Sequence, residues 1–204
     1  MPYNKNVFIN CPFDKEYYPL LRPLIFTIVY LGYKPRVTLE KSDSGTSRLE
    51  QLLTLISESK YSIHDLSRLQ ATKKKEFYRL NMPFELGIDY SSKKFSKGLS
   101  DKEFLILETK EYDYMKAISD INGLDIKAHG DEPLGIIKCV RNWFVETVGL
   151  KKLPSPTQIW YLFTDFYGEL YDKKQLENFS DNEINFMPIP EFIDEIEGFL
   201  VKSR

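Results

Sequence analysis

The stretch VFINCPFD at residues 7–14 sets the fold of the chain. The apolar run at residues 7–9 is typical of a short buried strand, and the Asn-Cys-Pro that follows marks a turn. Apolar residues recur at helical spacing over residues 17–31 before Gly32 ends the pattern, and residues 35–39 again favour a strand. A strand, a helix and a strand in this order are the beginning of an alternating α/β fold.

The same alternation continues along the chain. Residues 61–64, 104–107 and 126–128 favour strands, and helical spacing predicts helices from residue 49, over residues 84–91 and over residues 133–148. Residues 66–80, rich in Lys and Arg, predict a long loop or a short irregular helix. The pattern predicts an α/β fold, a flavodoxin-like doubly wound parallel sheet of about five strands.

A Pro-rich linker at residues 153–156 divides the chain. We predict an α/β domain over residues 1–150 and a helical extension over residues 151–204 with apolar residues at helical spacing. The extension is too small to hold its own core, so it should pack on the sheet domain or on a second subunit.

Composition excludes several classes of protein. The chain has 204 residues and a net charge of −2, so no general attraction to nucleic acid or to a membrane surface is expected. Cys11 and Cys139 lie far apart and fit reduced residues of a cytoplasmic protein, and neither a secretory signal nor a membrane-spanning run stands out. No P-loop, dinucleotide fingerprint, nucleophile elbow or firm metal-ligand spacing occurs, so no metal or bound cofactor is expected.

The run NMPFELG at residues 81–87 holds the leading catalytic candidate, Glu85. We expect Asn81 as the N-cap of a helix, Pro83 in its first turn, and Glu85 in that turn as well. Because a helix start carries unpaired N–H groups and a partial positive charge, Glu85 should stay ionised and face the cleft at the strand ends. The alternative is that Glu85 only complements the helix dipole.

Other candidates follow the predicted strands. Asn10 and the turn through Pro12 lie where a ribose or phosphate would approach, or Asn10 is simply a polar residue between a strand and a turn. Phe13 could stack on a base or belong to the core. Asp65 could hold a base or ribose hydroxyls, or simply form a turn at the end of its strand. Arginines are phosphate-ligand candidates or surface residues, and they are Arg36, Arg48, Arg68 and Arg79.

Three further polar features have possible functional roles. His64 fits a core histidine better than a general acid, whereas His129 follows the fifth predicted strand and could reach the cleft. The lysines at residues 73–75 fit a solvated loop, or a mobile lid over an anionic substrate.

The stretches at residues 7–14, 61–68 and 81–87 together resemble a bacterial TIR-like family related to the nucleoside 2-deoxyribosyltransferases. The resemblance covers roughly residues 5–148. It implies a flavodoxin-like fold, cleavage or transfer at an N-glycosidic bond, and Glu85 as the residue that carries the chemistry. Many bacterial TIR proteins cleave NAD in antiviral defence, so NAD would be a substrate here rather than a cofactor.

The chemistry agrees with that resemblance. Breaking a bond between a ribose carbon and a base nitrogen forms an oxocarbenium-like centre, which a carboxylate can stabilise or capture. Asn10, Pro12, Phe13, Asp65, Arg68 and Asn81 would then bind the nucleotide. Two other functions stay open: a non-catalytic nucleotide-sensing or assembly module, which could form homo-oligomers, and a nucleoside 2-deoxyribosyltransferase.

Overall fold

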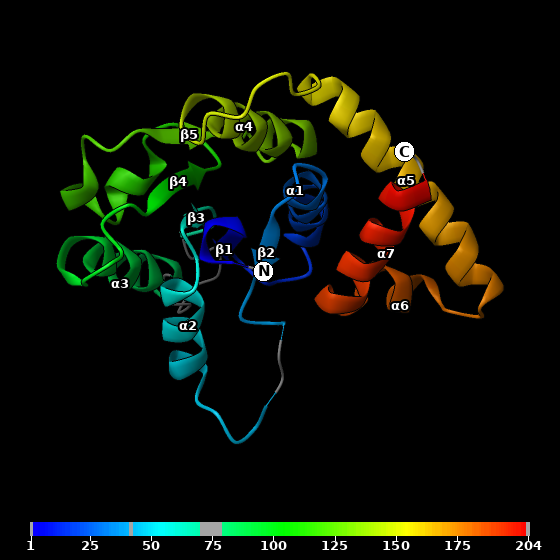
Figure 1. Cartoon of the computed structure of the whole chain (residues 1–204), viewed down its shortest axis with the longest axis horizontal. Helices are drawn as coiled ribbons and strands as arrows, with labels where there is room; N and C mark the ends of the chain where they lie inside the picture. The colour runs from blue at the N-terminus through cyan, green and yellow to red at the C-terminus, as the bar shows by residue number, and fades with distance from the viewer. Residues whose placement is uncertain (1, 41–42, 70–78, 203–204) are drawn as a thin grey trace. The chain divides into compact units, whose positions relative to one another are not determined.

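The structure is a computed structural model that describes residues 2–40, 43–69 and 79–202 (Figure 1). Its strands are β1 (Asn6–Asn10), β2 (Lys34–Arg36), β3 (Tyr61–Asp65), β4 (Glu103–Glu108) and β5 (Ile126–Ala128). Its α-helices are α1 (Tyr18–Tyr30), α2 (Arg48–Ser57), α3 (Asn81–Phe95), α4 (Pro133–Glu146), α5 (Pro156–Leu176), α6 (Asp181–Asn185) and α7 (Ile189–Lys202). Short 3₁₀ helices cover Tyr3–Lys5, Asp113–Lys116 and Ser119–Ile121. Within this part of the chain, no helix is long and apolar enough to cross a membrane.

The five strands form one parallel sheet in the order β2-β1-β3-β4-β5. This order is the flavodoxin-like one, in which ligands bind at the carboxyl ends of the strands where the chain reverses direction across the sheet, here between β1 and β3. The α/β fold with a five-stranded parallel sheet and C-terminal helices is therefore confirmed.

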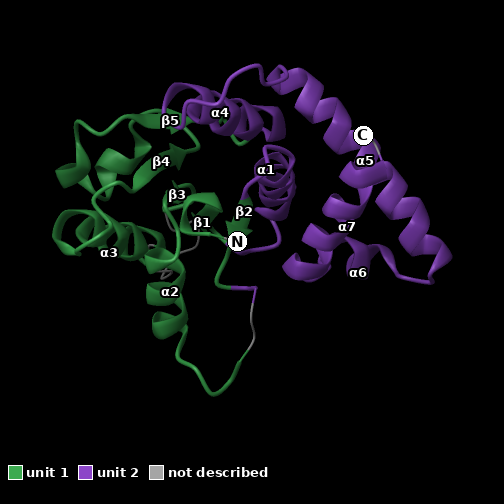
Figure 2. Cartoon of the chain, viewed as in Figure 1, with its two compact units in different colours: residues 1–12, 34–38, 43–131 green, residues 13–33, 39–42, 132–204 purple. Residues whose placement is uncertain are grey.

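Contacts divide the chain into two compact units (Figure 2). The first consists of residues 1–12, 34–38 and 43–131 and contains the sheet with α2 and α3. The second consists of residues 13–33, 39–42 and 132–204 and contains the other five α-helices. The predicted boundary at residue 150 falls inside the second unit and stays a prediction about domain organisation.

In the first unit, α2 and α3 pack on the sheet through two apolar clusters. The first cluster joins Phe8 of β1 to one face of α2 and includes Leu52, Leu55, Ile56 and Ile88. The second joins α3 to β4 and to the segments that follow β3 and β4, and its buried members are Leu66, Leu69, Met82, Leu86, Ile106 and Tyr114. Both clusters contain residues of α3, which fixes that helix against the sheet.

In the second unit, the C-terminal helices α5 and α7 pack on α1 through aromatic rings. The ring of Phe166 in α5 lies 5.4 Å from that of Phe26 in α1 and 5.6 Å from that of Phe192 in α7, measured between centroids. The buried Lys174 of α5 pairs with glutamates at 3.0–3.1 Å, which are Glu177, Glu191 and Glu195. The aromatic residues of the tail therefore cover apolar surface within this unit.

The helix that carries Glu85 begins earlier than the sequence predicts. α3 starts at Asn81 rather than at residue 84, and Leu80 precedes it without a side-chain cap. Pro83 is tolerated there because the first turn of a helix has no intrahelical use for its missing N–H. Asn81 is therefore the first helical residue, not the N-cap, and Glu85 lies in the second turn.

A chain of buried polar groups runs beneath α3. His64 Nε2 lies 3.1 Å from Asp89 Oδ2, and Lys102 Nζ lies 3.1 Å from Asp89 Oδ1, with all three side chains inaccessible to solvent. Lys102 also donates to the carbonyls of Ile56 and Ser59 at the end of α2. This network joins β3, α3, α2 and the residue before β4, and it leaves Asp89 fully paired.

The first prediction concerns the stability that this network provides. Asp89→Asn should lower the free energy of unfolding by about 3–5 kcal/mol, because it leaves Lys102 as an uncompensated buried charge. Urea unfolding at neutral pH measures the loss. Asp125→Asn, which breaks the exposed pair with Lys127 at 2.8 Å, is the matched control and should cost about 1 kcal/mol or less.

The same variant should change the pH dependence of stability. Burial alone would raise the pKa of Asp89, but the hydrogen bond from His64 and the charge of Lys102 outweigh it and lower the pKa. Stability from this group is therefore present above the ordinary pKa of Asp and is lost as pH falls through the lower, folded-state value. Equal stability of Asp89→Asn and wild type at neutral pH would contradict the assignment.

Candidate functional site

The buried face of α3 carries two carboxylates among apolar residues. Its buried side chains recur at helical spacing, and they are Met82, Glu85, Leu86 and Asp89. A position on such a stripe normally holds an apolar residue, because burying a carboxylate without a partner is costly. Asp89 has its partners in His64 and Lys102, so Glu85 is the member of the stripe that needs an explanation.

Glu85 has very little exposed surface and no neutralising contact among the described residues. The residue is 8% exposed, and no ion pair or hydrogen bond joins its carboxylate to another described side chain. Burial raises the pKa of Glu85, and the charge of Arg48, the first residue of α2, opposes that shift only in part. The expectation that Glu85 lies in the first helical turn is therefore wrong, and the surroundings of Glu85 raise its pKa rather than lower it.

Asn10 places the start of α3 at the end of β1. Its Nδ2 group donates to the carbonyl of Met82 over 2.8 Å and lies 3.0 Å from His64 Nδ1. Because Met82 offers a carbonyl oxygen, the nitrogen of the Asn10 amide must face it, and both amide hydrogens are then used. Asn10 is 1% exposed, so its amide group positions the helix that carries Glu85.

Asp65 belongs to a different cluster. The register pairs Asn10 with His64, so successive side chains place Asp65 on the opposite face of the sheet from these two. Its carboxylate accepts from the backbone N–H of Ser67 over 2.8 Å and lies 3.2 Å from His129 Nε2. The first contact is the strand-end turn that the sequence also allowed.

Ser67 and His129 complete that second cluster without forming a catalytic relay. Ser67 Oγ lies 2.8 Å from His129 Nε2, the same nitrogen that Asp65 contacts, while His129 Nδ1 accepts from the backbone N–H of Asp131. A Ser-His-Asp relay needs the serine and the carboxylate on opposite ring nitrogens. The buried His129 therefore fixes the loops after β3 and β5 to each other.

The remaining predicted binding residues differ in how exposed they are. Pro12 is buried, Asn81 is exposed at the start of α3, and Phe13 is half-buried in the second unit. Arg68 has a φ of 61°, and its Nη2 lies 3.7 Å from Oδ1 of Asp131. The lysines at residues 73–75, predicted as a loop or lid, lie outside the described residues.

Of the four arginines proposed as phosphate ligands, Arg48 lies where it acts on Glu85. Arg36 is held by Glu58 at 3.0 Å, Arg68 faces Asp131, and Arg79 is exposed before α3. Arg48 is exposed at the start of α2, and its charge favours the ionised form of Glu85. The charge of Arg48 therefore acts on Glu85. Asn10 holds α3, the helix that carries Glu85, at the end of β1.

A cavity of about 410 Å³ lies beside α3, on the side of Gly87 and Tyr90. The segment after β4 also lines it, and this segment contributes Ile118, Asp120, Ile121, Asn122, Gly123 and Leu124. Glu85 does not line it. In the described ranges, no group of three or more His, Cys, Asp or Glu side chains could hold a metal ion.

No family model and no curated protein matches the chain.

The second prediction is that the buried carboxylate of Glu85 lowers the stability of the protein at neutral pH. A carboxyl whose pKa is raised by folding binds its proton more tightly in the folded protein, so it destabilises the fold as pH rises through that value. Glu85→Gln should therefore raise the free energy of unfolding at neutral pH by about 0.5–2 kcal/mol. Each kcal/mol should raise Tm by roughly 2–4 °C in a chain of this length. The gain should shrink below the ordinary pKa of 4.5 for Glu, where wild type is protonated as well.

Thermal unfolding of wild type and Glu85→Gln at several pH values measures this difference. The exposed Glu111 of the same unit supplies the control, because Glu111→Gln removes one negative charge without changing a buried group. A loss of stability in Glu85→Gln at neutral pH would show that Glu85 has a stabilising partner, and this would contradict the site described here.

Proposed function

We propose that the protein is a TIR-like enzyme that hydrolyses the N-glycosidic bond of NAD or a related nucleotide, with Glu85 as its catalytic carboxylate. The observation that carries the proposal is the contrast along one face of α3. Asp89 is buried and neutralised, whereas the nearly buried Glu85 has, among the described residues, only the charge of Arg48 acting on it. A destabilising carboxylate at such a place is typical of a site selected for chemistry.

The proposed reaction uses Glu85 at the sugar carbon. The bond between C1′ of the ribose and the base nitrogen breaks, and its electron pair goes to the base. The carboxylate of Glu85 stabilises the oxocarbenium-like centre or forms a bond to it. Water then supplies the hydroxyl group at C1′ and releases a proton, which gives free base and the ribosylated product.

The electrostatics favour a leaving group that needs no proton. Nicotinamide leaves NAD as a neutral base, whereas a purine or pyrimidine of a nucleoside usually requires a general acid. On the buried face of α3, the second acid is Asp89, which His64 and Lys102 hold and whose pKa is lowered. This favours NAD over the nucleoside substrates of a 2-deoxyribosyltransferase, and the resemblance extends the proposal to bacterial antiviral defence.

The proposal requires Glu85 to be ionised during turnover. Because burial raises its pKa, the rate should fall as pH drops through a value above the ordinary pKa of 4.5 for Glu. Arg48 opposes this shift, so Arg48→Gln should move the acid limb of the pH–rate profile to higher pH.

The third prediction is tested by incubating the full chain with NAD and, separately, with nucleosides, and separating the products by chromatography. Wild type should release nicotinamide, and Glu85→Gln should lower the rate by at least about a hundredfold while still binding NAD. Glu111→Gln should keep the wild-type rate. The assay covers a range of protein concentrations, because TIR enzymes often need assembly to become active.

Two results would contradict the proposed enzymatic function. A Glu85→Gln rate close to that of wild type would remove the role of Glu85. Binding of NAD by wild type with no release of base at any protein concentration would instead identify a nucleotide-sensing or assembly module.

A further inference from the structure

Arg22 of α1 is a buried cation in the middle of the second unit. It is 4% exposed and donates from Nη2 to the carbonyls of Ile184 and Asn185 over 3.0 and 2.9 Å. Its Nε and Nη1 atoms have no hydrogen-bond partner, and no carboxylate pairs with it in the described part of the chain. An arginine keeps its charge in proteins, so this unit buries a positive charge that, among its described residues, carbonyls and aromatic rings alone offset.

The guanidinium is surrounded by aromatic rings. Its central carbon lies 4.2 Å from the centroid of Phe192, 5.8 Å from that of Tyr167 and 5.9 Å from that of Tyr18. Such contacts partly compensate a buried cation, but they supply no negative charge. Burial accordingly lowers the pKa of Arg22, although Tyr167 and Tyr18 oppose the shift.

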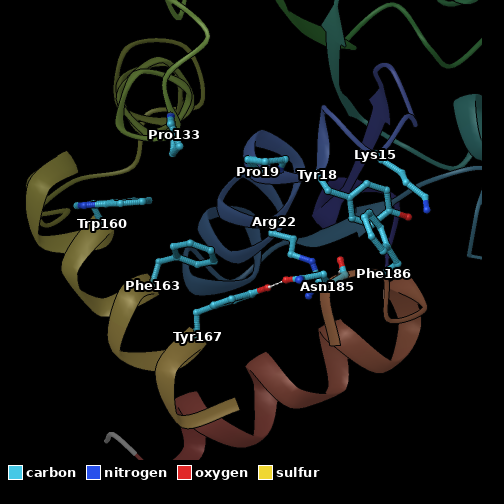
Figure 3. A pocket seen from close by; sticks show the side chains of 10 residues that line it. All are labelled: Lys15, Tyr18, Pro19, Arg22, Pro133, Trp160, Phe163, Tyr167, Asn185 and Phe186. Carbon is cyan, nitrogen blue, oxygen red and sulfur yellow. Dashed lines mark hydrogen bonds between the residues drawn. The ribbon is translucent and has the colours of Figure 1, made fainter. Parts of the chain in front are cut away.

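Arg22 lines a cavity of about 430 Å³ within this unit (Figure 3). This volume is in the range of small-molecule sites. Trp160, Phe163 and Tyr167 project into the cavity from α5, on the opposite side from α1. The other lining residues are Lys15, Tyr18, Pro19, Pro133, Asn185 and Phe186.

The lining residues that the structure describes include two cations and no acid. Lys15, which is exposed, has its ammonium 4.8 Å from the ring centroid of Phe186, and Arg22 lies deeper in the unit. The cavity beside α3 in the first unit is different, since its described lining residues include Asp120 and no cation. Five aromatic side chains and two positive charges favour a flat ring that carries negative charge.

We propose that this cavity binds a small molecule that combines a planar ring with an anionic group, such as a carboxylate or a phosphate. The ring lies among Trp160, Phe163 and Tyr167, and the anion faces Lys15 and the side of the cavity that Arg22 lines. The anion supplies the negative charge that this unit lacks around Arg22. The site lies wholly in the second unit and is independent of the reaction proposed for Glu85.

Trp160 supplies the readout. The chain has two tryptophans, and the other, Trp143 of α4, does not line the cavity. In full-length Trp143→Phe protein, the fluorescence of Trp160 reports occupancy. The test ligands are AMP and indole-3-acetate, each of which combines a ring with an anion. The control ligands are adenosine, indole and inorganic phosphate, each of which lacks either the anion or the ring. The fluorescence is corrected for the light that the ligand rings absorb.

At least one of AMP and indole-3-acetate should bind, at least about tenfold more tightly than its uncharged ring or than inorganic phosphate. Tighter binding of AMP than of adenosine identifies a phosphate as the anion, and tighter binding of indole-3-acetate than of indole identifies a carboxylate. Lys15→Gln should weaken this binding several-fold, and rising salt should weaken it as well, because both reduce the attraction between the anion and the cations.

Arg22→Lys tests the deeper cation. This substitution keeps the charge but loses the planar guanidinium, so it should weaken ligand binding more than Lys15→Gln does. If Arg22→Lys does not fold, the Lys15→Gln variant still tests the proposal. Three results would each overturn the proposal: no binding of either anionic ring up to millimolar concentration, equal binding of charged and uncharged rings, or an affinity unchanged by Lys15→Gln.

Discussion

Glu85 and Asp89 lie one turn apart on the buried face of α3, and the first unit neutralises one of them while leaving the other with little compensation. Asp89 accepts from His64 and pairs with Lys102, which also holds the carbonyls at the end of α2. Asn10 then ties the carbonyl of Met82, in the first turn of α3, to the end of β1. These contacts hold the part of α3 that carries Glu85 against β1 and β3.

This arrangement distinguishes polar residues that hold the fold together from a polar residue available for chemistry. A network in which each polar group has a partner fixes a helix against a sheet, and it can do so without any role in chemistry. A nearly buried carboxylate without such partners costs stability, and the raised pKa of Glu85 expresses that cost. The proposal that Glu85 acts on a sugar cation rests on this difference, and the buried Arg22 of the second unit supports a binding site by the same reasoning.

The sequence predicted the fold better than the contacts of its polar residues. Alternating apolar runs identified the strands, and β5 has the predicted bounds, because local spacing reflects which side chains are buried. α3 starts at Asn81, three residues before the range 84–91 that helical spacing predicts, because its first turn accepts Pro83. Partners of polar residues could not be predicted in this way, because they depend on which strands become neighbours.

Particular residues show that limit. Asn10 was expected to bind a ligand, yet its amide holds α3; from sequence alone, a polar residue at a strand end looks the same in either role. Asp89 and Lys102 were not singled out, because their partners come from other elements, although Asp89 follows Glu85 at the spacing of one helical face. Arg22 could have been noticed as a charged residue inside the apolar run LLRPLIF at residues 20–26.

The most direct test of the central claim is the pKa of Glu85 itself. Carbon-13 NMR of the side-chain carboxyl groups, recorded as a function of pH, gives a titration for each acid, and the resonance absent from Glu85→Gln identifies Glu85. We predict that this resonance titrates above the ordinary pKa of 4.5 for Glu, while the resonance absent from Asp89→Asn titrates below the ordinary 3.8 for Asp. A Glu85 carboxyl that titrates at or below 4.5 would mean that the protein neutralises it as it does Asp89, and this would contradict the account.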